Sequence, residues 1–233
     1  MKHRKLRNID FDKVADALMS QTHHGQVHLD ICEGLTKADP FILNQTPVFW
    51  QYTIGGHMYC AMMYAIKLFD NHGDAYTVPI FLEMARLRAD KFRKGSSKEV
   101  LELVADADVQ IGKLGDTIRE LRRRRNHILA HISEQLVLRN EKERLLTTEQ
   151  VRTVLLEAGK IVNSLTIKWA GFINAGYPST DDYIRVISMV NDYLCRQADQ
   201  HDEEFARYGE HFKLPPYARP RDCPKKRCST CWC

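Results

Sequence analysis

The sequence predicts an all-α protein, an antiparallel bundle of five to six helices followed by a short irregular tail. Apolar residues recur at steps of three and four over long segments, which is the spacing of one helix face. No alternation of apolar and polar residues, the pattern of a strand, competes with this spacing. The 233 residues include 12 glycines and 8 prolines, with 44% hydrophobic and 27% charged residues, which is ordinary for a soluble and mainly helical protein.

The first three helices are expected at about residues 11–28, 49–70 and 77–90, with a connection at 40–47 and a polar break at 91–97. The polar cluster at the end of the first helix makes its last turn hard to place. The expected buried faces are Val14, Ala17 and Leu18 in the first helix, Phe49, Tyr52, Tyr59, Met63 and Ile66 in the second, and Ile80, Met84 and Leu87 in the third.

The remaining helices are expected at about residues 97–132, 147–176 and 179–209. We expect an interruption of the first of these within residues 106–115. Thr147 and Gln150 have the spacing of a capping box, and Gly176 is the expected end of the same helix. Together with the first three segments, these helices predict a bundle.

The chain divides into an expected helical bundle at residues 1–212 and a basic tail at 213–233, rich in proline and cysteine. The tail carries six Lys or Arg and one Asp. No signal-like run opens the sequence, and its most apolar segment, residues 54–69, is too short to cross a bilayer. These features predict a cytoplasmic protein with no membrane partner.

Arg125 stands where the helical spacing predicts a hydrophobic residue. The apolar positions on either side of it are Ile111, Leu114, Ile118, Leu121, Ile128 and Ile132. Because a guanidinium keeps its charge, placing it on a packing face costs free energy unless a partner or a solvated cleft receives it. The position therefore predicts a site.

Residues that suit a phosphate follow this arginine. Asn126, His127 and His131 continue the same helix, and His131 flanks Ile128 on the side opposite to Arg125. A second reading is open, because His127 and His131 are four residues apart and could hold the metal of a metal-dependent phosphohydrolase. A solvated basic run followed by two ordinary histidines is a third reading.

Arg125-Asn126 followed by His131 resembles the motif of the HEPN superfamily, in which an arginine, a polar residue and a histidine lie on one helix of a bundle. Leu68-Phe69-Asp70 and Ala130-His131 resemble its AbiU-like branch, named after a U-type abortive-infection protein that resists phage. The resemblance covers residues 10–208. An acidic residue is expected after the Ala-His pair in this branch, where this chain has Ile132-Ser133.

The resemblance implies a metal-independent endoribonuclease, in which the 2′-hydroxyl of RNA attacks the neighbouring phosphate and leaves a 2′,3′-cyclic phosphate. It implies that His131 transfers protons, Arg125 stabilises the transition state and Asn126 orients the phosphate or the arginine. It also implies a homodimer, a role in phage defence or in a toxin–antitoxin pair, and a nucleotidyltransferase antitoxin as partner. Other members of the superfamily are non-catalytic modules that bind a nucleotide or a protein, and this alternative stays open.

Further cations lie on the helix that carries the motif. Arg119, Arg122, Arg123 and Arg124, together with His127, would extend a positive surface for RNA. In the tail, four thiols fall within eleven residues, and they are Cys223, Cys228, Cys231 and Cys233. Four thiolates suit a structural zinc ion, but this spacing is tighter than usual, so zinc and a metal-free tail are both open. No cofactor is expected for catalysis.

Overall fold

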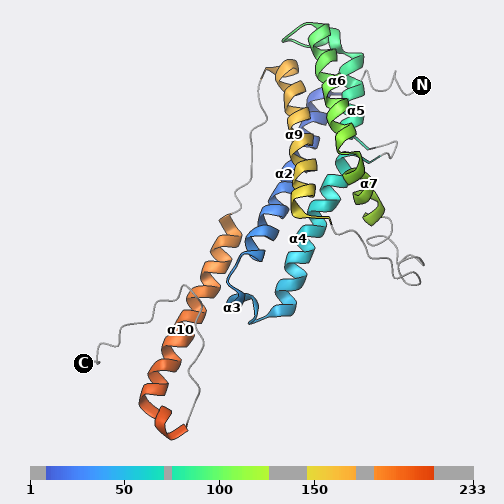
Figure 1. The fold of residues 1–233 in the computed structure, drawn as a ribbon. Coiled ribbons are helices and arrows are strands. Elements are labelled where there is room, and N and C mark those ends of the chain that lie inside the picture. Colours follow the sequence, from blue (N-terminus) through green and yellow to red (C-terminus); the bar gives the residue numbers. More distant parts are fainter. Residues whose placement is uncertain (1–8, 71–74, 126–145, 172–180, 213–233) are drawn as a thin grey trace, which may run out of the picture. The chain divides into compact units, whose positions relative to one another are not determined.

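The computed structural model describes residues 9–70, 75–125, 146–171 and 181–212, and it confirms the all-α class (Figure 1). No strand occurs in these four ranges. The chain forms two compact units. One unit combines Met1–Asp30 with Gly56–Pro178, and the other combines Ile31–Gly55 with Ser179–Cys233. The expected division between a bundle and a tail concerns residues that lie largely beyond the described ones, and it stays a prediction.

Two long helices, α2 (Phe11–Thr36) and α4 (Pro47–Leu68), contribute to both units. The first unit is completed by α5 (Val78–Leu87), the short 3₁₀ helix η1 (Ala89–Lys91), α6 (Ser97–Lys113), α7 (Gly115–Arg124) and α9 (Thr148–Ala170). The second unit is completed by α3 (Pro40–Leu43) and α10 (Asp181–Phe212). Counting α6 and α7 as one bent segment and setting aside the single-turn α3, the expected six helices are all present in the described part of the chain.

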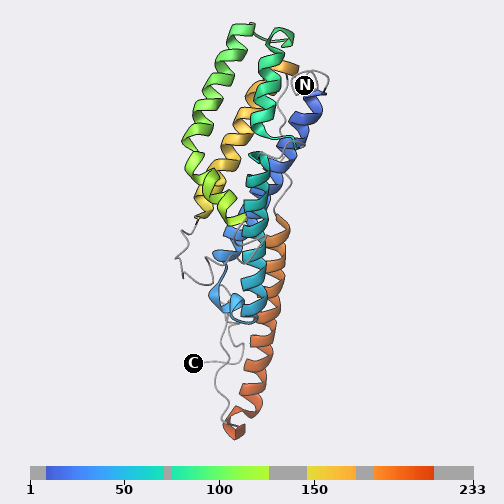
Figure 2. The same cartoon turned by 90° about the vertical axis from the view of Figure 1, so that its right-hand side faces the viewer.

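The core of the first unit forms around α9, which packs against α5, α6 and α7 (Figure 1, Figure 2). At one end of this core, the Phe11 ring lies with its centroid 4.4 Å from that of Phe81 and 4.6 Å from that of Trp169. Farther along α2, a Cβ atom built on Gly25 would come within 2.6 Å of the Leu155 side chain. A glycine is therefore what lets α2 approach α9 closely at this point.

Helix α2 continues eight residues beyond the expected end at His28, as far as Thr36. The helix continues through its polar cluster, within which the hydroxyl of the buried Thr22 donates to the carbonyl of Leu18 at 2.9 Å. The expected face was wrong at Ala17, which is exposed, whereas Ala15 is buried.

Helix α4 begins at Pro47 and reverses the expected pattern in its first turns. Phe49 is 59% exposed and Tyr52 is 78% exposed, whereas the buried positions nearer the end of the helix include Ala61 and Ile66. The expected connection at 40–47 contains α3, where the Asp39 carboxylate accepts from the backbone N–H of Phe41 at 2.9 Å. The connection is thus partly helical.

Helix ends follow local capping where the sequence provides it. The interruption expected within residues 106–115 occurs at Leu114, between α6 and α7. The Thr147–Gln150 capping box is confirmed, and Ser96 and Glu99 form another at the start of α6. The expected stop at Gly176 was wrong, because α9 ends at Gly171, which has a left-handed φ of 85° that favours glycine.

The second unit has its own apolar cluster. Leu194 of α10 is buried together with Leu35, Ile42 and Trp50, which come from α2, α3 and α4. Within this unit, α10 thus covers the part of the α2–α4 pair that belongs to it. No helix in the described ranges is both long enough and apolar enough to cross a membrane.

Candidate functional site

Arg125 directly follows α7 and keeps helical backbone angles, with φ −53° and ψ −49°. Its backbone N–H donates to the carbonyls of Leu121 and Arg122. The two preceding positions of the expected apolar face, Ile118 and Leu121, are buried. The Arg125 side chain is 22% exposed, so it is partly removed from water.

Asp70 receives the charge of Arg125. The Nη1 group of Arg125 donates to Oδ2 of Asp70 in an ion pair, and the Asp70 side chain is 16% exposed. Asp70 lies just beyond the end of α4, two residues after Leu68. The sequence predicted that a partner or a cleft must exist, and the structure identifies this carboxylate as a partner.

A second arginine of α7 also contacts the end of α4. The Nη2 group of Arg122 donates to the backbone carbonyl of Phe69, the residue before Asp70. The last carbonyls of a helix lack partners within the helix and carry its negative end charge, so a guanidinium there is favourable. Two arginines three residues apart therefore contact two consecutive residues at the end of α4.

The other cations of α7 pair with acidic residues on their own helix. Glu120 accepts from Nε and Nη2 of Arg123 at 2.9 and 2.8 Å, and its Oε1 lies 3.7 Å from Nε of Arg124. The Nη1 atom of Arg119 lies 3.2 Å from Oδ1 of Asp116, and both side chains are more than three-quarters exposed. Arg119 is therefore accessible from solvent, whereas Arg122 and Arg124 face protein groups.

The rest of the expected site lies outside the described residues. This applies to Asn126, His127 and His131 of the motif, and to the four tail cysteines Cys223, Cys228, Cys231 and Cys233. The structure thus brings Arg125 to Asp70 and Arg122 to Phe69. Sequence reasoning noted Leu68-Phe69-Asp70 as a resemblance but assigned it no partner, because nothing in the sequence says which helix end faces α7.

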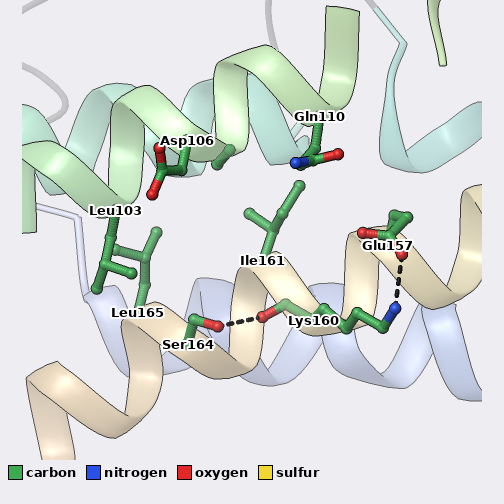
Figure 3. Close-up of a pocket in the computed structure, with 9 residues that line it drawn as sticks. Leu103, Asp106, Gln110, Glu157, Lys160, Ile161, Ser164 and Leu165 are labelled. Atoms are coloured by element: carbon green, nitrogen blue, oxygen red, sulfur yellow. Dashed lines mark hydrogen bonds and ion pairs between the residues drawn. The ribbon is translucent and has the colours of Figure 1, made fainter. Parts of the chain in front are cut away.

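A surface hollow of about 150 Å³ lies between α6 and α9, and no arginine of α7 is among the residues that line it (Figure 3). Apolar side chains such as Leu103 and Ile161 line it together with polar ones. Among the polar groups, the Lys160 ammonium pairs with the Glu157 carboxylate at 2.6 Å, and the Ser164 hydroxyl donates to the Lys160 carbonyl at 2.8 Å. The described residues contain no group of three metal-ligating side chains.

A cluster of histidines joins α2 to α4 in the first unit. The Nδ1 atoms of His28 and His57 lie 2.8 Å apart, so one ring donates and the other accepts. Burial, followed by the neighbouring His57 and His24, lowers the pKa of His28, and burial lowers the pKa of His57. The Tyr64 ring stacks against both His24 and His28.

Comparison with models of known protein families gives a match for this chain. The model of the HEPN_AbiU2 family, described as AbiU2, matches residues 36–188, which is more than half of the chain and includes both Asp70 and the segment from Arg125 to His131. No curated protein and no solved structure matches the chain. On the strength of the family match, together with the all-α fold and the arginine at the expected position, this chain belongs to the AbiU2 family of HEPN proteins.

Proposed function

We propose that the protein is a metal-independent endoribonuclease of HEPN type. The observation that carries the proposal is the placement of Arg125, which begins the stretch that resembles the HEPN motif, as a partly buried cation paired with Asp70. A solvated basic run would leave this guanidinium on the outer face of α7. A cation that is partly desolvated and oriented by a carboxylate is the kind of group that stabilises charge developing on a phosphate.

In the proposed reaction, the 2′-oxygen of a ribose bonds to the adjacent phosphorus and the bond from phosphorus to the 5′-oxygen breaks. The products are a 2′,3′-cyclic phosphate and a 5′-hydroxyl. His131 transfers the proton that the 2′-hydroxyl loses and the 5′-oxygen gains, because an imidazole titrates near neutral pH. Arg125 stabilises the negative charge of the transition state with its guanidinium, and Asn126 orients the phosphate or the arginine.

A single assay separates this function from its two alternatives. Purified protein and its His131→Ala and Arg125→Lys variants are incubated with end-labelled RNA in excess chelator, and the product ends are analysed. Cleavage to cyclic phosphate by the parent alone supports the proposal. Cleavage that requires added metal supports a phosphohydrolase using His127 and His131. Intact RNA under both conditions supports a non-catalytic module that binds a nucleotide or a protein.

The biological setting is proposed on the same basis. Membership of the AbiU2 family supports a role in abortive infection, and we extend this to RNA as substrate, a homodimer as the active form and a nucleotidyltransferase antitoxin as partner. Arg119 would contact RNA phosphates, since its side chain is exposed. We place the protein in the cytoplasm. Elemental analysis of the full chain tests the proposed structural zinc at the tail cysteines.

A further inference from the structure

We propose that Asp70 is a positioning residue, which orients Arg125 for the scissile phosphate. It thereby raises the turnover of RNA and weakens the binding of RNA. This inference rests on the proposed ribonuclease function. It concerns a residue at the end of α4, far in sequence from the motif, whose carboxylate has so far been described only as a partner for the charge of Arg125.

The geometry restricts Arg125 from two directions. Its backbone is held at the end of α7, and its Nη1 group is held by Oδ2 of Asp70. Asp70 in turn follows Phe69, whose carbonyl accepts from Arg122 three residues earlier on α7. The contact of Arg122 thus fixes the α4 end against α7, and Asp70 then sets the direction in which the Arg125 guanidinium points.

Two further carboxylates of α7, Glu120 and Asp116, pair with arginines of the same helix. The Oε1 atom of Glu120 lies 2.8 Å from Nη2 of Arg123 and 3.7 Å from Nε of Arg124. Asp116 pairs with the exposed Arg119. The ion pair between Arg125 and Asp70 instead joins the end of α7 to the end of α4.

A carboxylate beside a phosphate site has two opposite consequences. Its negative charge repels the RNA backbone, which weakens binding. It also holds the guanidinium in one orientation, and a group held in place before the reaction stabilises the transition state better than one that must be ordered during it. Asp70 should therefore raise both KM and kcat, a combination that a purely structural residue would not produce.

The test compares Asp70→Asn with Asp116→Asn, which removes one negative charge from the same region but at an exposed pair. We expect Asp70→Asn to lower kcat for RNA cleavage by about 10- to 100-fold. We also expect KM, and the Kd for the same RNA carrying 2′-O-methyl groups that block cleavage, to fall. Asp116→Asn should leave kcat unchanged. Asp70→Glu retains the charge and should recover part of the turnover with KM close to that of the parent.

An unchanged or raised kcat in Asp70→Asn would overturn the inference, since Asp70 would then have no effect on the reaction or would hold Arg125 in a less reactive position. If the loss of kcat in Asp70→Asn equals the loss of folded protein measured by circular dichroism, Asp70→Glu decides the matter. A folded Asp70→Glu variant with the kcat of the parent would then also overturn the inference. If the parent cleaves no RNA at all, the ribonuclease proposal fails first. The Kd for methylated RNA then still tests Asp70, because the absence of any tightening in Asp70→Asn counts against its place beside a phosphate site.

Discussion

At the scale of single residues, the fold accepts a permanent cation on a packing face because it supplies a carboxylate within reach. The side chains of Arg125 and Asp70 are 22% and 16% exposed, so removing one of them takes an ion-pair partner from a charge that is only partly solvated. This distinguishes the pair from Arg119 and Asp116, where water already solvates both groups and the ion pair contributes little.

We therefore predict that Arg125→Gln destabilises the protein by about 2 kcal/mol, because Asp70 is left partly buried beside an uncharged group. Asp70→Asn combined with Arg125→Gln should lose less than the sum of the two single variants, by about 1 kcal/mol. Urea unfolding followed by circular dichroism measures these differences. Arg119→Gln is the control and should change stability by less than about 0.5 kcal/mol. Strict additivity of the two variants would show that Arg125 and Asp70 are not energetically coupled.

The pair His28 and His57 predicts a pH dependence of stability. Folding lowers the pKa of both rings below the ordinary histidine value of 6.5, so the unfolded chain binds more protons in the window below that value. The stability that the neutral pair provides is present above about pH 6.5 and is lost as the pH falls through the lower, folded-state pKa values. The Tyr64 ring stacks against His28, and the nearby His24 is one of the groups that lower the pKa of His28.

Thermal unfolding between pH 7.5 and pH 5 measures this effect. The parent should lose stability on acidification, and His28→Asn should flatten the dependence, because asparagine retains a polar group near the position of Nδ1 but does not titrate. A His28→Asn profile parallel to that of the parent would show that other groups carry the dependence.

At the scale of helices, packing decides how a glycine in α2 or α4 affects stability. A Cβ atom on Gly25 would lie 2.6 Å from a methyl group of Leu155 and 3.1 Å from Cβ of Tyr64, whereas one on Gly55 would have no neighbour within 4 Å. The same residue type therefore permits a close helix contact at position 25 and only lowers helix stability at position 55.

This contrast gives a matched prediction. Gly25→Ala should destabilise the protein by about 1–2 kcal/mol, because overpacking outweighs the gain in helix propensity. Gly55→Ala should stabilise it by about 0.5–1 kcal/mol. Chemical denaturation of both variants checks the opposite signs. Stabilisation by Gly25→Ala would mean that Leu155 moves aside at little cost.

At the scale of the whole molecule, each of the two units closes its own apolar cluster, yet α10 also presents apolar side chains to solvent. Val186, Met189 and Tyr193 lie at steps of three and four on this helix and are each at least half exposed. Exposed apolar side chains that form one stripe are typical of protein interfaces. This stripe is the surface through which we expect the proposed homodimer to form.

We predict that the protein sediments at twice the chain mass of 27.0 kDa and that Met189→Lys shifts it toward the mass of one chain. A lysine in the stripe would bury a charge at the interface, which opposes association. Ser188→Lys, at an exposed position on another side of α10, is the control and should leave the mass unchanged. A monomer in the parent, or a dimer in Met189→Lys, would place the interface elsewhere or remove it.

The sequence alone determined the helical class, a break within residues 106–115, the capping box at Thr147 and the anomaly at Arg125, because each depends on residues close together in the chain. It placed the face of α4 wrongly at Phe49 and Tyr52 and ended α2 too early, because hydrophobicity does not reveal which helix arrives to cover a surface.

Tertiary structure alone decided which carboxylate meets Arg125. Asp70 lies 55 positions earlier in the chain, and no local pattern connects the end of α4 to the end of α7. A charge on a packing face shows that a partner or a cleft is required, since desolvation must be offset. Only the packing of α7 against the end of α4 determines that the partner is this residue.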